Sequence, residues 1–232
     1  MLQGTDRGPR RGAAGPWYRP AVPLPIVVVA AAVAVTVVGV SFVFSTDART
    51  RWALKKVPVT PISGPRAGQL ARVRGRIVAG GELLAAPLSE RVCVYYVTTA
   101  EKLRSGGNSS SWQEVAREER YADFVVEDGS GALRVRMAVP RVAIVRDVHT
   151  RSGTFDDANP REEAFLRRHG LQSTSALLGL NLTMRYIEGV LEPGEEVTAL
   201  GLVREEGGAR VLDATEDGPL ILSDDPRAVQ AP

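Results

Sequence analysis

Cysteine and histidine are scarce in this chain of 232 residues, which has one cysteine, Cys93, and two histidines, His149 and His169. A single cysteine excludes an intramolecular disulfide, and three such ligands are too few for the cysteine-rich sites that hold structural zinc. The sequence therefore gives no support for a metal centre on nitrogen or sulfur ligands, and no cofactor is expected. Cys93 lies between Val92 and Val94, where a small buried side chain is the usual role.

Enzyme signatures and a strong net charge are also lacking. The sequence has no Gly-x-Ser-x-Gly element, no phosphate-binding loop and no dinucleotide fingerprint. Its 29 basic residues nearly balance its 27 acidic ones, so the summed charge does not favour nucleic acid as a partner. One enzymatic alternative remains open, an unrecognised polar site formed by Asp147, His149, Asp156 and Glu188.

Charge is absent from Pro20 to Thr46, and residues 26–44, "IVVVAAAVAVTVVGVSFVF", are apolar almost throughout. About 20 such residues at a rise of ~1.5 Å span a ~30 Å hydrocarbon core, so we predict a transmembrane helix over residues 22–45 and expect the lipid bilayer as a partner. A cleaved signal peptide is the alternative, but the run is longer than the usual apolar region of about 7–15 residues and lacks a small-residue cleavage site. Trp52 follows the run where aromatic residues meet lipid headgroups.

The flanks of this segment set the predicted organisation of the chain. Basic residues are equally frequent on both sides, but a short basic tail before a first helix favours a single-pass protein with an extracytoplasmic domain. Residues 1–21 are predicted to be a disordered basic tail. Residues 46–68, which include the proline-rich "VPVTPISGP", are predicted to be a stiff juxtamembrane linker. A folded domain is expected over residues 69–223, followed by a disordered tail at 224–232.

Period-2 alternation dominates the soluble part and predicts a mainly β fold with one inserted helix. Short strands separated by turn residues are typical of a small β-barrel or sandwich, and an OB-like barrel is the preferred version. The segment "KLRSGGNSSSWQEV" is rich in glycine and serine and is interpreted as a flexible hairpin connection. Five barrel strands are expected, over residues 72–79, 91–99, 122–128, 132–139 and 195–204.

The first of these strands predicts two different faces. Val73 and Ile77 fall on the core side, and three arginines alternate with them on the solvated side. Such a row of arginines offers a contact surface for anionic lipid, or for nucleic acid in an OB-type groove, as a further alternative function. The arginines of this predicted surface are Arg72, Arg74 and Arg76.

Two other segments give specific local predictions. In "DDANPREEAFLRRHGL", Asn159 is the expected N-cap, Pro160 the first helical residue and Gly170 the residue after the helix, which is expected to cap an opening of the sheet structure. The segment "RYIEGVLEPGEEVTALGLV" is interpreted as a hairpin that turns at Pro193-Gly194. Its Glu188 is expected to hold the barrel together through a basic partner or backbone N–H groups.

Read in order, "VRGRIVAGGELLAAPLSERVCVYYV", "DFVVEDGSGALRVRMA" and "RYIEGVLEPGEEVTALGLV" resemble the GIDE-type domain, also called the beside-a-membrane domain. This domain occurs in membrane-anchored E3 ubiquitin ligases of mitochondria and in their bacterial relatives. The residues that match the family pattern, and to which the resemblance gives structural roles, are Gly75, Pro87, Cys93, Tyr95, Tyr96, Phe124, Asp128, Gly131, Glu188, Gly194 and Gly201.

The resemblance implies a membrane-proximal domain that binds a protein, a peptide or lipid. Ligases of this family carry a cysteine-rich RING finger, and one cysteine cannot hold its two zinc ions. The function expected from the sequence is therefore a membrane-anchored binding or scaffolding module with a protein or peptide partner and without ligase activity. The abundance of arginine, alanine, valine and glycine points to a bacterial member.

Overall fold

The computed structural model describes residues 50, 52–106, 109–138, 140–145, 148–153, 157–174, 182–216 and 218–226. All of them belong to one compact unit, Ser41–Pro232. The predicted tail at 1–21, the predicted transmembrane helix at 22–45 and the last six residues of the chain lie outside the described residues. No helix among the described residues is long and apolar enough to cross a membrane.

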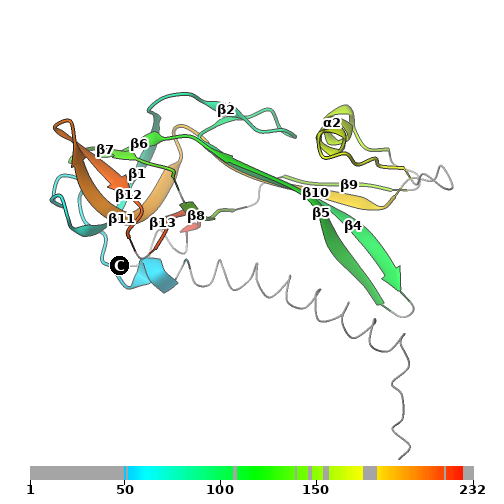
Figure 1. The fold of residues 1–232 in the computed structure, drawn as a ribbon, viewed down its shortest axis with the longest axis horizontal. Coiled ribbons are helices and arrows are strands. Elements are labelled where there is room, and N and C mark those ends of the chain that lie inside the picture. The colour runs from blue at the N-terminus through cyan, green and yellow to red at the C-terminus, as the bar shows by residue number, and fades with distance from the viewer. Residues whose placement is uncertain are drawn as a thin grey trace, which may run out of the picture. The chain divides into compact units, whose positions relative to one another are not determined.

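Five strands pair in a closed ring, β1-β6-β7-β12-β11, because β1 pairs with β11 as well as with β6 (Figure 1). The predicted barrel is thus confirmed. Two more strands continue its sheet beyond β11, and the ladders are antiparallel except β12–β7 and β13–β8. The strands of this sheet are β1 (Leu70–Ala79), β6 (Phe124–Asp128), β7 (Gly131–Val135), β8 (Pro140–Ala143), β11 (Glu196–Glu206), β12 (Ala209–Asp213) and β13 (Leu220–Ser223).

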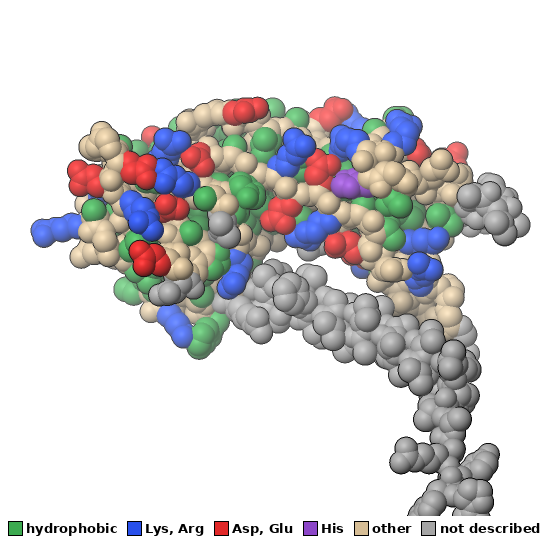
Figure 2. Space-filling model, in the orientation of Figure 1, with side chains coloured by type: hydrophobic (Ala, Val, Ile, Leu, Met, Phe, Trp, Pro, Cys, Tyr) green, Lys and Arg blue, Asp and Glu red, His purple; other side chains and the backbone are tan. Residues whose placement is uncertain are grey.

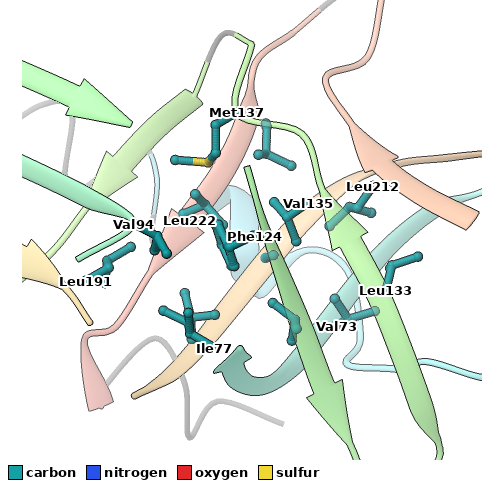
Figure 3. Packing of buried hydrophobic residues seen from close by; sticks show 14 of the residues in the cluster. Val73, Ile77, Val94, Phe124, Leu133, Val135, Met137, Leu191, Leu212 and Leu222 are labelled. Atoms are coloured by element: carbon teal, nitrogen blue, oxygen red, sulfur yellow. The ribbon is translucent and has the colours of Figure 1, made fainter. Parts of the chain in front are cut away.

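The interior of the barrel is filled by apolar side chains from every wall. Val73 of β1, Phe124 of β6, Val135 of β7 and Leu212 of β12 converge there with Leu222 of β13, and each is fully or almost fully buried (Figure 3). Large side chains removed from water contribute roughly 1.5–3 kcal/mol each to stability. The alternation of β1 predicted from the sequence therefore sets the inner face of the barrel correctly.

The segment predicted as the second barrel strand, 91–99, belongs elsewhere. It contains β3 (Val92–Cys93), which pairs with β2 (Leu84–Ala85), and the start of β4, which lies in a separate four-stranded sheet. The barrel takes β12 as its fifth strand instead. The four-stranded sheet has the order β5-β4-β10-β9, from β5 (Ser109–Tyr121), β4 (Tyr95–Gly106), β10 (Met184–Leu191) and β9 (Val148–Ser152).

The predicted flexible connection at 102–115 is wrong as well. It lies largely within β4 and β5, which pair from Tyr95–Tyr121 to Gly106–Ser109 and form a long two-stranded arm (Figure 1). Gly106 pairs with Ser109 and Ser105 with Ser110 in this ladder, so the described glycine and serine residues of the segment are paired strand residues.

The predicted hairpin at 185–203 is not formed either. β10 pairs with β4 and β9, whereas β11 pairs with β1, β12 and β13, so the chain changes sheets at Pro193-Gly194. Both runs are strands, as predicted, but a strand pattern does not say which neighbour a strand will take.

The helix α2 (Pro160–Arg168) begins as predicted. The Asn159 side chain accepts hydrogen bonds from the N–H groups of Arg161 and Glu162, and the Glu162 carboxylate returns to the N–H of Asn159. This capping box satisfies amide groups that would otherwise lack partners. Phe165 and Leu166 pack on the four-stranded sheet, which α2 therefore covers.

The domain also begins earlier than residue 69. Leu54 is fully buried against Leu200 and Ile221, and Ile62 is part of the barrel core. Most of the described segment predicted as a linker is therefore fastened to the barrel.

Candidate functional site

Glu188 lies on β10 and is completely buried. Its carboxylate accepts hydrogen bonds from the N–H of Leu88 at 2.9 Å, the N–H of Ser89 at 3.0 Å and the hydroxyl of Thr98 at 2.9 Å. Backbone N–H groups, one of the two predicted kinds of partner, thus hold this carboxylate. They come from the loop between β2 and β3, so Glu188 fastens that loop to the four-stranded sheet and not one barrel strand to another.

The hypothesised polar enzyme site is not assembled by the residues that the structure describes. His149 pairs with Ile187 and Val148 with Glu188 across β9 and β10. Because neighbouring residues of a strand point to opposite faces, His149 and Glu188 lie on opposite sides of the sheet. Asp147 and Asp156 lie outside the described residues.

The predicted arginine surface is broken up. Arg72 is fully buried, and its guanidinium donates to the carbonyl oxygens of Leu54 at 3.0 Å and Val57 at 3.3 Å. The prediction that Arg72 meets an anionic surface is therefore wrong, because the chain before the barrel covers it. Burial lowers the pKa of Arg72.

The other two arginines are engaged on the outer wall of β1. Arg74 forms a two-pronged ion pair with Glu196, with both N–O distances 2.7 Å, and Arg76 donates to the carbonyl oxygen of Gly194. The hydrogen bonds that Arg74 donates to Glu196 raise the pKa of Arg74 despite some loss of solvation, and the same bonds lower the pKa of Glu196. Acidic and basic side chains alternate over the face of the domain seen in Figure 2, and no sign dominates.

A hollow of about 930 Å³ lies beside these arginines, between β1, the turn after β6 and the chain at residues 59–61. Asp128 stands on its wall and accepts hydrogen bonds from the N–H groups of Ile62 at 2.9 Å, Ser130 at 2.7 Å and Gly131 at 3.1 Å. Partial burial opposes ionisation of Asp128, but the Ser130 hydroxyl and these N–H groups outweigh it and lower its pKa. Asp128 is thus a structural anchor, and the paired charges in the hollow do not select a ligand of one sign.

The outer edge of β5 has a different character, because it offers main-chain groups. The N–H of Ala122 donates to the carbonyl oxygen of Val94 at 2.8 Å, so the main-chain groups of Ala122 point toward β4. Along an antiparallel strand the main-chain groups of successive residues point alternately toward and away from the paired strand. The main-chain groups of the alternate residues Arg117, Glu119 and Tyr121 therefore point away from β4. No described strand pairs with β5 on that side. We refer to the main-chain groups of these three residues as the β5 outer edge.

Sequence reasoning missed the β5 outer edge. The strand carries many polar and charged residues and only short apolar stretches, so it lacks the alternation that reveals a half-buried strand. Its pairing is fixed instead by the neighbouring β4, whose Tyr95 and Tyr96 hydroxyls donate to Glu119 at 2.8 Å and Glu118 at 2.5 Å. Burial and the Glu118 carboxylate raise the pKa of Tyr96.

The remaining family-pattern residues lie mostly in the interior or at close crossings of the chain. Cys93 is buried, and burial together with the charges of Glu188 and Glu192 raises its pKa to about 12. A Cβ atom on Gly75 would lie 2.4 Å from the carbonyl oxygen of Glu127 in the neighbouring strand β6, so only glycine fits. Phe124 is a core residue, and Pro87 lies in the loop that Glu188 holds. Gly131 follows the turn at Asp128, and Gly194 lies where the chain passes from one sheet to the other. A Cβ atom on Gly201 would lie 2.5 Å from the carbonyl oxygen of Asp213 in β12, a crossing as close as that of Gly75 and β6.

Comparison with known proteins confirms the resemblance. No curated protein and no solved structure matches the chain. The model of the GIDE family, described as E3 ubiquitin ligase, matches residues 94–228, from the start of β4 through the last described strand. This match covers more than half of the chain and contains both the β5 outer edge and Glu188. The chain belongs to the GIDE family.

Proposed function

We propose that this protein is a single-pass membrane protein whose GIDE domain binds an extended segment of a partner protein along the β5 outer edge, without transferring ubiquitin itself. In this proposal residues 22–45 lie in the bilayer and the domain is extracytoplasmic. The observation that carries the proposal is the length of β5, which spans thirteen residues at the edge of its sheet.

Edge strands of this length are uncommon, because their outward N–H and C=O groups can pair with another chain. An extended peptide uses the same groups when it adds a strand to a sheet, and the main chain then supplies most of the affinity. The barrel strands are closed into a ring and have no such edge. The GIDE domain thus combines a closed barrel with a sheet that can be extended.

The side chains beside the β5 outer edge are compatible with strand addition. Arg117 forms ion pairs with Glu114 and Glu119, at 3.9 and 3.0 Å, on the exposed face of the strand. These ion pairs lie on the face of β5 and leave its outward main-chain groups open to an added strand. An exposed ion pair contributes only about 0–1 kcal/mol to stability, so the side chains can rearrange at little cost when a partner binds. A neutral, extended segment is therefore the expected kind of partner.

The composition of these 232 residues supports the proposed lack of ligase activity. One cysteine and two histidines cannot supply the four ligands that each of two structural zinc ions requires. Purified full-length protein is expected to form no ubiquitin chains when it is mixed with ubiquitin, its activating enzyme and a conjugating enzyme. Chain formation in that mixture would contradict this part of the proposal.

The binding part is tested by cross-linking in cells. A photoreactive amino acid is placed at Ser110, on β5, and in a control protein at Glu82, which is exposed outside the sheet. Arg117→Pro removes an outward N–H without breaking the β4–β5 ladder, and Arg117→Gln removes the same charge but keeps the N–H. We expect a protein adduct from Ser110 that Arg117→Pro abolishes and Arg117→Gln preserves. An adduct that survives Arg117→Pro, or that forms equally from Glu82, would refute docking on this edge.

A further inference from the structure

The short helical segment that precedes the barrel has one buried side and one exposed side. Residues 52–55 are helical, and Leu54 is buried against Leu200 and Ile221 of the barrel sheet. Trp52 points the other way and is 63% exposed, the highest value among the large apolar side chains of the described residues. Lys56 places its Nζ atom 3.2 Å from the centre of the Trp52 ring. An aromatic ring and an ammonium group are thus held together on the outer side.

This outer side cannot turn inward, because the segment is fastened at its own backbone. The buried guanidinium of Arg72 holds the carbonyl oxygens of Leu54 and Val57, and the N–H of Thr60 donates to the carbonyl oxygen of Arg72 at 2.8 Å. Buried charged hydrogen bonds of this kind are costly to break. Trp52 therefore remains exposed although apolar surface is favoured inside.

A second set of contacts attaches the next part of the segment to the end of β6, to the turn after it and to β12. The N–H of Ile62 donates to Asp128 at 2.9 Å, and the N–H of Ser63 donates to the hydroxyl of Ser130 at 3.0 Å. From β12, Arg210 donates to the carbonyl oxygen of Ile62 at 2.9 Å. The segment from residue 54 to residue 63 is consequently part of the barrel, and the position of Trp52 is set by the folded domain.

The sequence places this exposed side close to the predicted membrane span. Seven residues lie between Phe44, the end of the apolar run, and Trp52, so eight residue-to-residue steps connect the two. These eight steps cover about 12 Å as a helix and at most ~28 Å when extended, so Trp52 can reach the headgroup layer that borders the hydrocarbon core. Four basic residues fall within residues 49–56: Arg49, Arg51, Lys55 and Lys56.

We propose that the outer side of residues 52–56 binds the phosphate headgroups of the membrane, with the Trp52 ring at the interface and with Lys55 and Lys56 on anionic lipid. Tryptophan is enriched at this depth of a bilayer, and basic residues next to a span bind anionic lipid. The contact would fix the height of the barrel above the bilayer. This inference rests on the membrane anchoring proposed above.

The test uses the full chain in vesicles of phosphatidylcholine, with or without phosphatidylglycerol. Trp17→Phe and Trp112→Phe leave Trp52 as the single tryptophan, whose fluorescence then reports quenching by bromine-labelled lipid or by a water-soluble quencher. We expect quenching by the labelled lipid that increases with phosphatidylglycerol and decreases with salt. Because each basic residue near an anionic surface contributes about fivefold in affinity, Lys55→Gln with Lys56→Gln should markedly reduce the effect of phosphatidylglycerol. The matched control Arg167→Gln, on the exposed side of α2, should leave it unchanged.

Three results would overturn the inference, and they can be told apart. If an alkaline wash leaves the protein in the vesicles but Trp52 responds only to the water-soluble quencher, the headgroup contact is wrong and the anchor stands. If the wash releases the protein, the anchor and the contact are both wrong. If inorganic phosphate at low millimolar concentration removes the lipid quenching, the site binds free anions and the membrane is not its partner.

Discussion

Replacing Glu188 by alanine removes the acceptor of three hydrogen bonds at once. The N–H of Leu88 and the hydroxyl of Thr98 are buried, whereas Ser89 is partly exposed and its N–H can be reached by water. A buried donor that loses its partner costs about 1–3 kcal/mol, and two such donors together with the lost volume give an expected destabilisation of about 4 kcal/mol. For a domain of this size, such a loss lowers the melting temperature by about 8–16 °C.

Two further variants separate the contributions of this site. Glu188→Gln keeps the volume and one acceptor oxygen but turns an amide toward a donor, so we expect about half of the loss, ~2 kcal/mol. Thr98→Val removes one donor and should cost about 1 kcal/mol. Because Glu188 and Thr98 are in contact, the double variant should be less destabilised than the sum of the two, by ~1 kcal/mol.

The measurement is thermal unfolding of the full chain in detergent, followed by circular dichroism. Glu205→Ala is the matched control, because Glu205 is an exposed glutamate at the end of β11 and its removal should change the stability by no more than about 0.5 kcal/mol. If Glu188→Ala behaves like Glu205→Ala, then the buried carboxylate does not hold the loop between β2 and β3, and the structural role assigned to it is wrong.

Three other predictions concern the barrel and its surroundings. Gly75→Ala should lower the free energy of unfolding by about 1–3 kcal/mol, because the new methyl group would collide with the carbonyl of Glu127. Gly81→Ala, with open space around it, should leave the stability unchanged, and equal melting temperatures of the two variants would contradict the close crossing at Gly75. Cys93, whose pKa is raised to about 12, should not react with a disulfide reagent at neutral pH until the protein is unfolded in urea, and rapid labelling of the native protein would refute its burial. Asp128, whose pKa is lowered in the folded protein, contributes stability that is present above its unfolded pKa of about 3.9 and is lost as the pH falls through the lower folded value. Asp128→Asn should therefore lower the melting temperature at pH 7 and flatten its decline as the pH falls below about 4, and an unchanged decline would count against this role.

Local signals predicted local structure well. Asn159 and Pro160 marked the start of α2 because a cap and a first-turn proline act within a few residues. The alternation of Val73 and Ile77 marked the inner face of β1 for the same reason. The ordered set of family-pattern residues was sufficient by itself to recognise the GIDE domain.

The partners of the strands could not be predicted in this way. The run at 91–99 and the run at 185–191 both read as strands, but the sequence does not encode directly that they pair with each other across β4 and β10. Cross-strand pairing depends on contacts between segments far apart in the chain, and the same alternation fits several neighbours. The β5 outer edge was missed for the related reason that a strand with solvent on much of its surface has no strong apolar pattern.

Arg72 shows most clearly which properties the sequence determines and which depend on the tertiary structure. The sequence by itself determined that arginines alternate with the core residues of β1, that an apolar run of membrane-spanning length precedes the domain, and that one cysteine cannot build a RING finger. Only the tertiary structure decided that the chain at residues 54–57 covers Arg72 and exposes Trp52. A side chain's periodicity fixes the direction in which it leaves the strand, but its burial depends on which distant segment packs against it, and that is decided by the folded chain as a whole.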